Sequence, residues 1–156
     1  MKRETMMKIR AMTKDDVEKC LELGQAMHEE SYFSFLTFNK EKLLALWVSI
    51  TDYPQMFCGF VAEEGDEIVG LFVGGVSPHW FSDDLFASDM ALYVTPSHRG
   101  SSAAVRLLKA YDIWATESGA KVINLGISTN INQDRTQKLY HKLGYKDMGL
   151  FNRRKL

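Results

Sequence analysis

The sequence is short of cysteines and of long apolar runs, and it has no excess of either charge. Cys20 and Cys58 are the only cysteines, and neither has the spacing of a zinc site or a disulfide framework. No apolar stretch approaches the ~20 residues that cross a bilayer. The net charge of -1 offers no electrostatic case for binding nucleic acid or an anionic membrane. We therefore expect a cytoplasmic protein that binds neither.

Several catalytic and metal-binding motifs are also absent. There is no Gly-x-Gly-x-x-Gly, no Gly-Lys-Ser/Thr and no Gly-x-Ser-x-Gly, which argues against dinucleotide, P-loop and α/β-hydrolase sites. The four histidines are scattered without metal-ligand spacing. We expect no metal site.

The remaining composition is that of an ordinary globular domain. Apolar residues make up 46% of the chain and charged residues 25%. With 156 residues and no repeat or linker, we expect one domain over residues 1–156, with a core of about residues 7–151. Residues 1–6 lack the apolar centre of a signal peptide, so we expect a disordered lead-in or an early start codon ahead of Met7.

Apolar periodicity and turn residues predict the element order β-α-α-β-β-β-α-β-α-β. The order combines a hairpin-rich first half with a β-α-β-α-β second half. We therefore expect an α/β (α+β) fold with a mixed, mostly antiparallel central sheet and helices on both faces. The later predicted elements are a strand at 87–95, a helix ending at 118–119, a strand at 121–127, a helix at 130–143 and a strand at 145–151.

The stretch from Thr95 to Ala104 is the most informative part of the chain. An apolar strand breaks at Pro96 and the chain re-enters a helix through small residues. Such a turn leaves backbone N–H groups unpaired at the positive end of the helix dipole, beside Arg99. These features predict an anion site for a phosphate or pyrophosphate.

Two segments resemble motifs of the GCN5-related N-acetyltransferases (GNAT). Arg99–Ala104 resembles the family's Arg/Gln-x-x-Gly-x-Gly/Ala turn, with Ser102 where glycine is usual. Gln133–Tyr145 resembles the segment Asn-x-x-Ala-x-x-Leu-Tyr-x-x-x-Gly-Phe, with Tyr140 and Gly144 in place. The resemblance extends over nearly the whole chain, from Lys8 to Phe151.

The resemblance implies acetyl-CoA as co-substrate. Its pyrophosphate would bind the backbone amides of the turn, and its pantetheine arm would pair with the strand before it. Which of Asn130, Asn132 and Gln133 contacts the cofactor is left open. The implied cofactor-binding residues are Leu92, Tyr93, Val94, Arg99, Gly100, Ser101, Ser102, Ala103, Ala104, Asn132 and Gln133.

The resemblance also implies transfer of the acetyl group to a primary amine by direct attack. Tyr140 is the candidate acid for the departing thiolate, because a phenol keeps its proton at neutral pH; packing in a helix is its alternative role. Asp89 is the candidate base, with a solvated strand-end carboxylate as its alternative role and with Asp83, Asp84 and Glu30 as fallback bases. Many family members have no dedicated base. The alternative function is a non-catalytic acyl-CoA-binding or regulatory module on the same fold.

Two further features bear on substrate and partner. The loops Tyr32–Phe38 and Ser77–Asp84 would flank the acceptor side, where aromatic and acidic groups suit a cationic amine; core packing is the alternative for most of these aromatics. Only twelve residues follow Gly144, where many family members have two strands. The missing strand would leave a sheet edge to be covered, which favours a homodimer.

Overall fold

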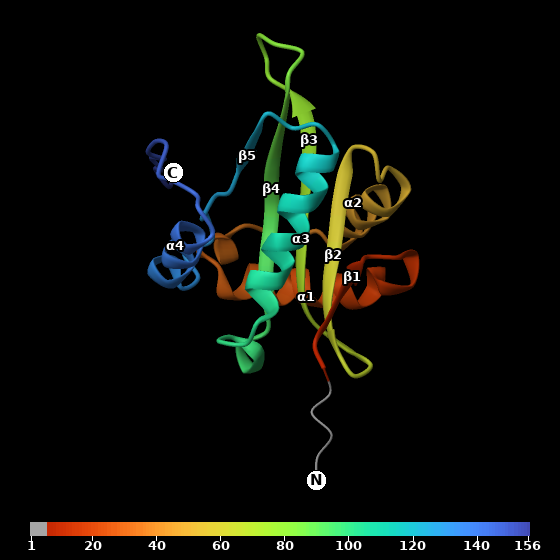
Figure 1. Ribbon diagram of the computed structural model, residues 1–156. Helices are drawn as coiled ribbons and strands as arrows, with labels where there is room; N and C mark the ends of the chain where they lie inside the picture. Colours follow the sequence, from red (N-terminus) through yellow and green to blue (C-terminus); the bar gives the residue numbers. More distant parts are fainter. Residues whose placement is uncertain (1–5) are drawn as a thin grey trace.

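A five-stranded sheet with helices on both faces forms the framework of the protein (Figure 1). The computed structural model describes residues 6–156, so most of the predicted lead-in lies outside the described residues. The strand order is β1-β2-β3-β4-β5. Three neighbouring pairs are antiparallel, and β4 and β5 are parallel. The predicted mixed, mostly antiparallel sheet is confirmed.

The order of elements agrees with the prediction up to the last helix. The strands are β1 (Lys8–Ala11), β2 (Phe57–Glu64), β3 (Glu67–Pro78), β4 (Leu85–Val94) and β5 (Val122–Asn124). The α-helices are α1 (Val17–Glu30), α2 (Lys40–Asp52), α3 (Ala103–Glu117) and α4 (Gln133–Lys142). Short 3-10 turns are η1 (Lys14–Asp16), η2 (Tyr32–Phe35) and η3 (Pro96–His98).

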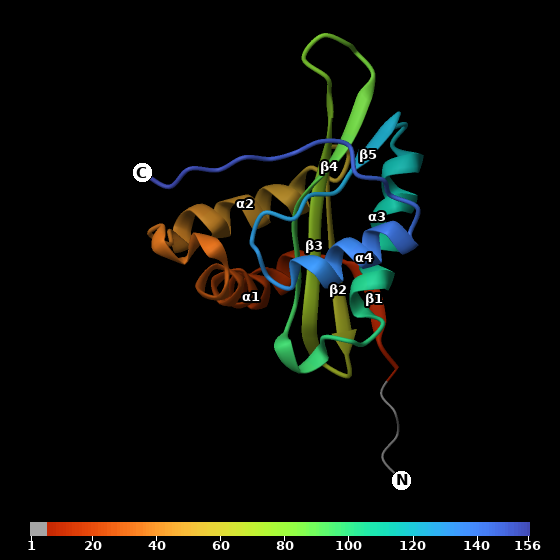
Figure 2. The ribbon, with the colours of Figure 1, turned by 90° about the vertical axis from the view of Figure 1, so that its left-hand side faces the viewer.

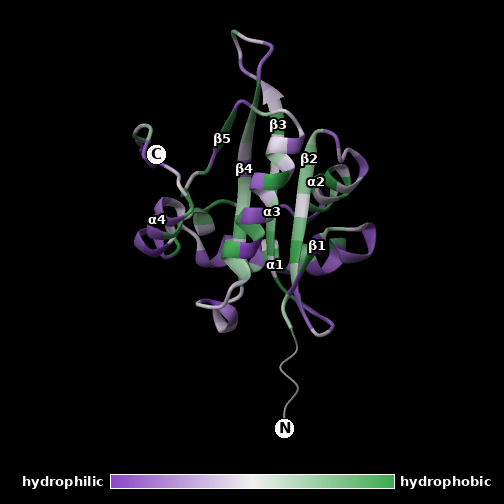
Figure 3. Cartoon of the chain, viewed as in Figure 1, coloured by the Kyte–Doolittle hydropathy of each residue, from purple (hydrophilic) through white to green (hydrophobic). Residues whose placement is uncertain are grey.

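The sheet separates two apolar clusters. Helices α1 and α2 cover one face and α3 covers the other (Figure 2). Strand β3 lies in the centre and is buried from Ile68 to Gly74 because both faces are covered. Trp47 of α2 belongs to one cluster, and Tyr111 of α3, packed against Phe72, belongs to the other. Figure 3 shows hydrophobic residues concentrated on the strands and hydrophilic ones on α4. Because successive side chains of a strand point to opposite faces of the sheet, the same strands contribute residues to both clusters.

Strands β4 and β5 separate after a short paired stretch. They pair only from Phe86 with Val122 to Ser88 with Asn124. On its other side β4 carries a bulge: Val73 pairs with Ala91 and Gly74 with Asp89, which leaves one extra residue between them. A bulge bends and twists the strand that carries it. The main chain of β4 beyond Ser88 therefore has no β5 partner, and a gap opens between the strands.

The C-terminal end differs from the prediction. The expected strand at 145–151 is irregular chain. A further strand would have to pair with the edge strand β5, and β5 is short because it ends at Asn124. The last helix begins at Gln133 rather than at residue 130, because Asn130 and Asn132 adopt left-handed φ angles of 59° and 47°. Among the helices described, none has the length and apolar character needed to cross a membrane.

Candidate active site

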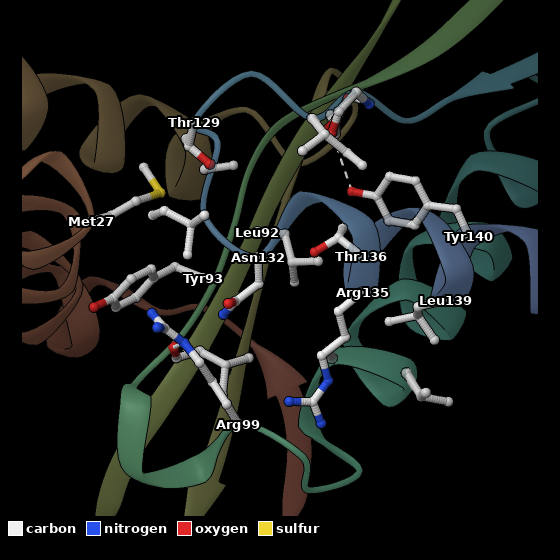
Figure 4. A pocket seen from close by; sticks show the side chains of 18 of the residues that line it. Met27, Leu92, Tyr93, Arg99, Thr129, Asn132, Arg135, Thr136, Leu139 and Tyr140 are labelled. Atoms are coloured by element: carbon white, nitrogen blue, oxygen red, sulfur yellow. Dashed lines mark hydrogen bonds between the residues drawn. The ribbon is translucent and has the colours of Figure 1, made fainter. Parts of the chain in front are cut away.

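A cavity of about 500 Å³ lies where β4 and β5 separate. It is bounded by β4, the turn before α3, the segment 126–132 and α4 (Figure 4). This volume is within the range of small-molecule sites. We call this cavity the cleft.

One end of the cleft is the turn that leads into α3. Gly100 has a φ of +90°, which favours glycine because other residues meet their own backbone there. Within the described residues, no acceptor faces the amides of Ser102, Ala104 and Val105. The first amides of a helix and its dipole favour an anion. The turn therefore presents a set of unpaired donors, which the predicted anion site requires.

Arg99 does not direct its charge toward this turn. Its guanidinium forms a two-pronged ion pair with Glu30 of α1, with Nη2 2.7 Å from Oε2. Its Nε donates to the Val94 carbonyl at 3.0 Å, and the Tyr93 hydroxyl donates to Glu30 at 3.1 Å. The hydrogen bond from Arg99 lowers the pKa of Glu30. The charge of Arg99 is therefore compensated at the wall of the cleft, where its side chain lies beside Tyr93 (Figure 4).

Arg135 of α4 supplies a second guanidinium, and the sequence analysis missed it. A Cβ added at Gly100 would lie 3.0 Å from its Nη2, so the guanidinium lies against the turn. Among residues 6–156, no carboxylate pairs with Arg135. Arg135, Lys138 and Lys142 line the cleft at i, i+3 and i+7. This spacing marks one face of a helix, but only the packing of α4 shows that the face borders the turn.

The other end of the cleft, which we call the apex, joins Asp89 and Tyr140 through one residue. The Gly126 amide donates to Asp89 Oδ1 at 3.0 Å, and the Tyr140 hydroxyl donates to the Gly126 carbonyl at 3.2 Å. Burial raises the pKa of Asp89 to about 6. Burial, with the nearby Asp89 charge, also raises the pKa of Tyr140. The apex thus combines a carboxylate that titrates near neutrality with a phenol that stays protonated.

Most of the residues expected at the site line the cleft. Ser102 and Ala103 do not, and the side chain of Ala103 is buried under the turn. Gln133 lies in a separate open hollow with Asn130, whereas Asn132 borders both cavities. The predicted residues that line the cleft are Asp89, Leu92, Tyr93, Val94, Arg99, Gly100, Ser101, Ala104, Asn132 and Tyr140.

Other lining residues come from elements that carry no recognisable motif. Met27 belongs to α1, Thr129 to the segment after β5, and Thr136 and Leu139 to α4 (Figure 4). No periodicity in the sequence distinguishes them from packing residues. Within the described part of the chain, no group of three or more histidine, cysteine or acidic residues could hold a metal ion.

Comparison with known protein families shows the family to which the chain belongs. Residues 22–145 match the model of the family described as Acetyltransferase (GNAT) family. The chain belongs to this family. It is therefore an acetyl-CoA-dependent acetyltransferase, which confirms the resemblance noted in the sequence.

Solved structures share the fold of the acetyltransferase over almost its whole length. The aminoglycoside N-acetyltransferase AAC(6')-Iy, in complex with the bisubstrate analogue CoA-S-monomethyl-acetylneamine, is 20% identical with a TM-score of 0.75, covering 97% of this chain and 99% of that one. A transcriptional regulator from Bacillus halodurans is 18% identical with a TM-score of 0.77, covering 97% and 100%. The aminoglycoside acetyltransferase meta-AAC0020 from an uncultured soil metagenomic sample, in complex with sisomicin, is 19% identical with a TM-score of 0.69, covering 96% of both chains. The comparison with curated proteins gave no match.

Proposed function

We propose that the acetyltransferase moves the acetyl group of acetyl-CoA to a primary amine by direct attack. The observation that carries the proposal is the pairing, in one cleft, of an anion-binding turn with the Asp89–Gly126–Tyr140 apex. A ligand that presents a diphosphate at one end and a thioester at the other matches this arrangement. Two of the structural neighbours are aminoglycoside acetyltransferases that were solved in complex with CoA-S-monomethyl-acetylneamine and with sisomicin, which supports an amine acceptor.

The chain's own groups fit coenzyme A along the cleft. The unpaired amides at Ala104 and Val105 would hold the diphosphate, with Arg135 as the uncompensated cation beside them. The unpaired edge of β4 at Leu92–Val94 would accept and donate to the amides of the pantetheine arm. When bound, acetyl-CoA supplies a thioester carbonyl as the electrophile. Binding the diphosphate and the pantetheine arm orients that carbonyl, and such positioning can lower the activation barrier of the reaction by up to ~7–11 kcal/mol.

Asp89 is the group that would take a proton from the amine. An ammonium has no lone pair, so the acceptor must be neutral when it attacks. With a pKa of about 6, the carboxylate is ionised at neutral pH and is a stronger base than an ordinary aspartate. The hydrogen bond from the Gly126 amide fixes one oxygen and leaves the other to accept a proton, directly or through a water.

Tyr140 is the group that would hold the proton needed by the leaving sulfur. Its raised pKa keeps the phenol protonated throughout the neutral range. The hydroxyl hydrogen lies toward the Gly126 carbonyl, and rotation about the C–O bond redirects it into the cleft. A hydrogen bond to the developing thiolate stabilises that charge and opposes the reverse reaction.

Free thiol release from acetyl-CoA tests the proposal. A panel of primary amines (a peptide amine, a lysine side chain, a polyamine, an aminoglycoside and hexylamine) is assayed with the full chain. We expect release that depends on at least one amine, together with a rise in Tm when coenzyme A is added. A rise in Tm without thiol release would indicate that the cleft only binds the cofactor. No rise would contradict the assignment of the turn.

A further inference from the structure

An arginine of the C-terminal tail rests on three aromatic rings beside the cleft. The Arg153 guanidinium carbon lies 4.6 Å from the ring centre of Tyr32, 4.5 Å from that of Phe33 and 5.6 Å from that of Phe151. We call these three rings the aromatic seat. Distances under 6 Å are those at which a cation is attracted to the face of a ring. Two of the rings come from η2, the turn between α1 and α2.

The aromatic seat is joined directly to the wall of the cleft. The Tyr32 amide donates to the Thr129 carbonyl at 2.8 Å, and Arg153 Nη1 donates to the Ser128 carbonyl at 3.1 Å. Ser128 and Thr129 both line the cleft. In Figure 2 the tail crosses the sheet edge from the α4 side toward α2. The cation held by the seat is therefore a neighbour of the space in which the acceptor must bind.

The contacts that hold the Arg153 guanidinium are ones that another cation could also make. No carboxylate within the described residues pairs with it, so its charge is met only by ring faces and one carbonyl. The preceding residues bury little: Leu150 and Phe151 are 96% and 84% exposed. Ring faces and a carbonyl oxygen accept an alkylammonium as well as a guanidinium. A free cation of the right reach could take the place of Arg153.

We propose that the aromatic seat binds a second cationic group of a polycationic amine acceptor, and that Arg153 occupies the seat until the acceptor displaces it. The inference rests on the proposed function, since it assigns the acceptor class of the same cleft. It makes the tail an internal competitor of the acceptor. Loss of the tail cation and loss of a ring of the seat must then have opposite effects on acceptor affinity.

Kinetics with two amines test that opposition. For Arg153→Gln we expect the KM for spermine to fall about two- to fivefold, and for Phe33→Leu to rise by about the same factor, the size of an exposed cation–π contact. The KM for hexylamine, which has one cation, should stay unchanged in both variants. Arg154→Gln is the matched control, because it removes the same charge from a neighbouring residue that touches no ring in the described structure.

Tryptic cleavage of the tail provides a readout that needs no turnover. Cleavage after Arg153 requires the tail to leave the seat, so spermine should accelerate loss of the last residues, measured by mass spectrometry, and hexylamine should not. A free peptide of residues 147–156 corrects for effects on trypsin itself. Phe33→Leu should be cleaved fast without spermine.

These measurements separate failure of the inference from failure of the proposed function. Cofactor-dependent thiol release with equal spermine KM values in Arg153→Gln and Arg154→Gln would overturn the role of the seat while leaving acetyl transfer intact. Unchanged tail cleavage at saturating spermine would overturn it as well. Absence of thiol release with every amine would instead count against the proposed function, and spermine-dependent cleavage would still support the seat.

Discussion

The two ends of the cleft work with different kinds of groups. At the turn before α3 the donors are main-chain amides, exposed by a left-handed Gly100 and the first turn of a helix. At the apex the groups proposed to react are two side chains, the half-buried Asp89 and the buried Tyr140, which are linked through Gly126. Main-chain donors depend on backbone conformation and tolerate many side chains, whereas the apex depends on two specific functional groups. Substitutions should therefore affect binding at the first end and turnover at the second.

The two arginines of the cleft show the same contrast on a smaller scale. Arg99 occupies the motif position, yet Glu30 compensates its charge. Arg135 has no motif, yet its guanidinium lies against Gly100 without a carboxylate partner among the described residues. Position in the sequence next to the turn thus did not decide which arginine is available to an anion. The presence or absence of a carboxylate partner decided it.

Tyr140→Phe should have the largest effect, and this effect should fall on turnover; a loss of cofactor binding instead would contradict the contrast between the two ends of the cleft. We expect kcat to fall about 10²–10⁴-fold, because general acid catalysis contributes that much, while the KM for acetyl-CoA changes little. Steady-state thiol release measures both. Tyr145→Phe is the control, since this hydroxyl contacts Asp112 and the residue does not line the cleft. An unchanged kcat in Tyr140→Phe would remove its role as acid.

Arg135→Gln should affect the other end of the cleft. Loss of one charge-assisted hydrogen bond to a phosphate corresponds to about 1.5–3 kcal/mol, so the Kd of coenzyme A should rise at least tenfold with kcat nearly unchanged. Arg99→Gln should weaken coenzyme A less, because Glu30 already holds that guanidinium. Calorimetric titration of both variants decides between them. A larger loss in Arg99→Gln would show that Glu30 releases its partner when the cofactor binds.

The smallest expected effect is the change that Asp89→Asn makes to the free energy of unfolding, and this change depends on pH. The folded pKa of about 6 exceeds the ordinary value of 3.8, so ionisation of Asp89 destabilises the native state as pH rises between those values. Asparagine keeps an oxygen for the Gly126 amide and carries no charge. We expect the variant to be about 1–2 kcal/mol more stable above pH 6.5, and equal to wild type near pH 4.

Urea unfolding at several pH values measures this difference. Asp83→Asn, the same change at an exposed loop position, is the control and should show no such pH dependence. The pH dependence of the reaction rate provides a second test of the Asp89 pKa. The wild-type rate should decline below about pH 6 as the carboxylate is protonated, and this acid limb should be absent from the residual rate of Asp89→Asn. Equal stability of the two proteins at pH 8 would show that the carboxylate is well solvated.

The parts of the fold that were predictable are those that local chemistry specifies. Two local signals are the turn residues Gly65-Asp66 and the proline at position 96. The structure has the hairpin of β2 and β3 at the first and the end of β4, followed by η3, at the second. The start of α4 was misplaced because nothing local distinguishes an asparagine in a left-handed conformation from one inside a helix. The strand expected at 145–151 failed for a non-local reason, since the edge strand β5 is only three residues long and offers little edge for a further strand to pair with. The pairing of a homodimer stays a prediction.

The sequence alone determined the order of elements as far as α4, the turn that exposes amides before α3, and the identity of Tyr140 and Asp89 as titratable candidates. These follow from periodicity, from small residues and from side-chain chemistry, which act over a few neighbouring residues. Only the tertiary structure decided that Glu30 compensates Arg99, that Arg135 lies against the turn and that Arg153 rests on the rings of η2. Each of these contacts joins residues more than thirty positions apart, and their meeting depends on how helices and tail pack around the separated strands.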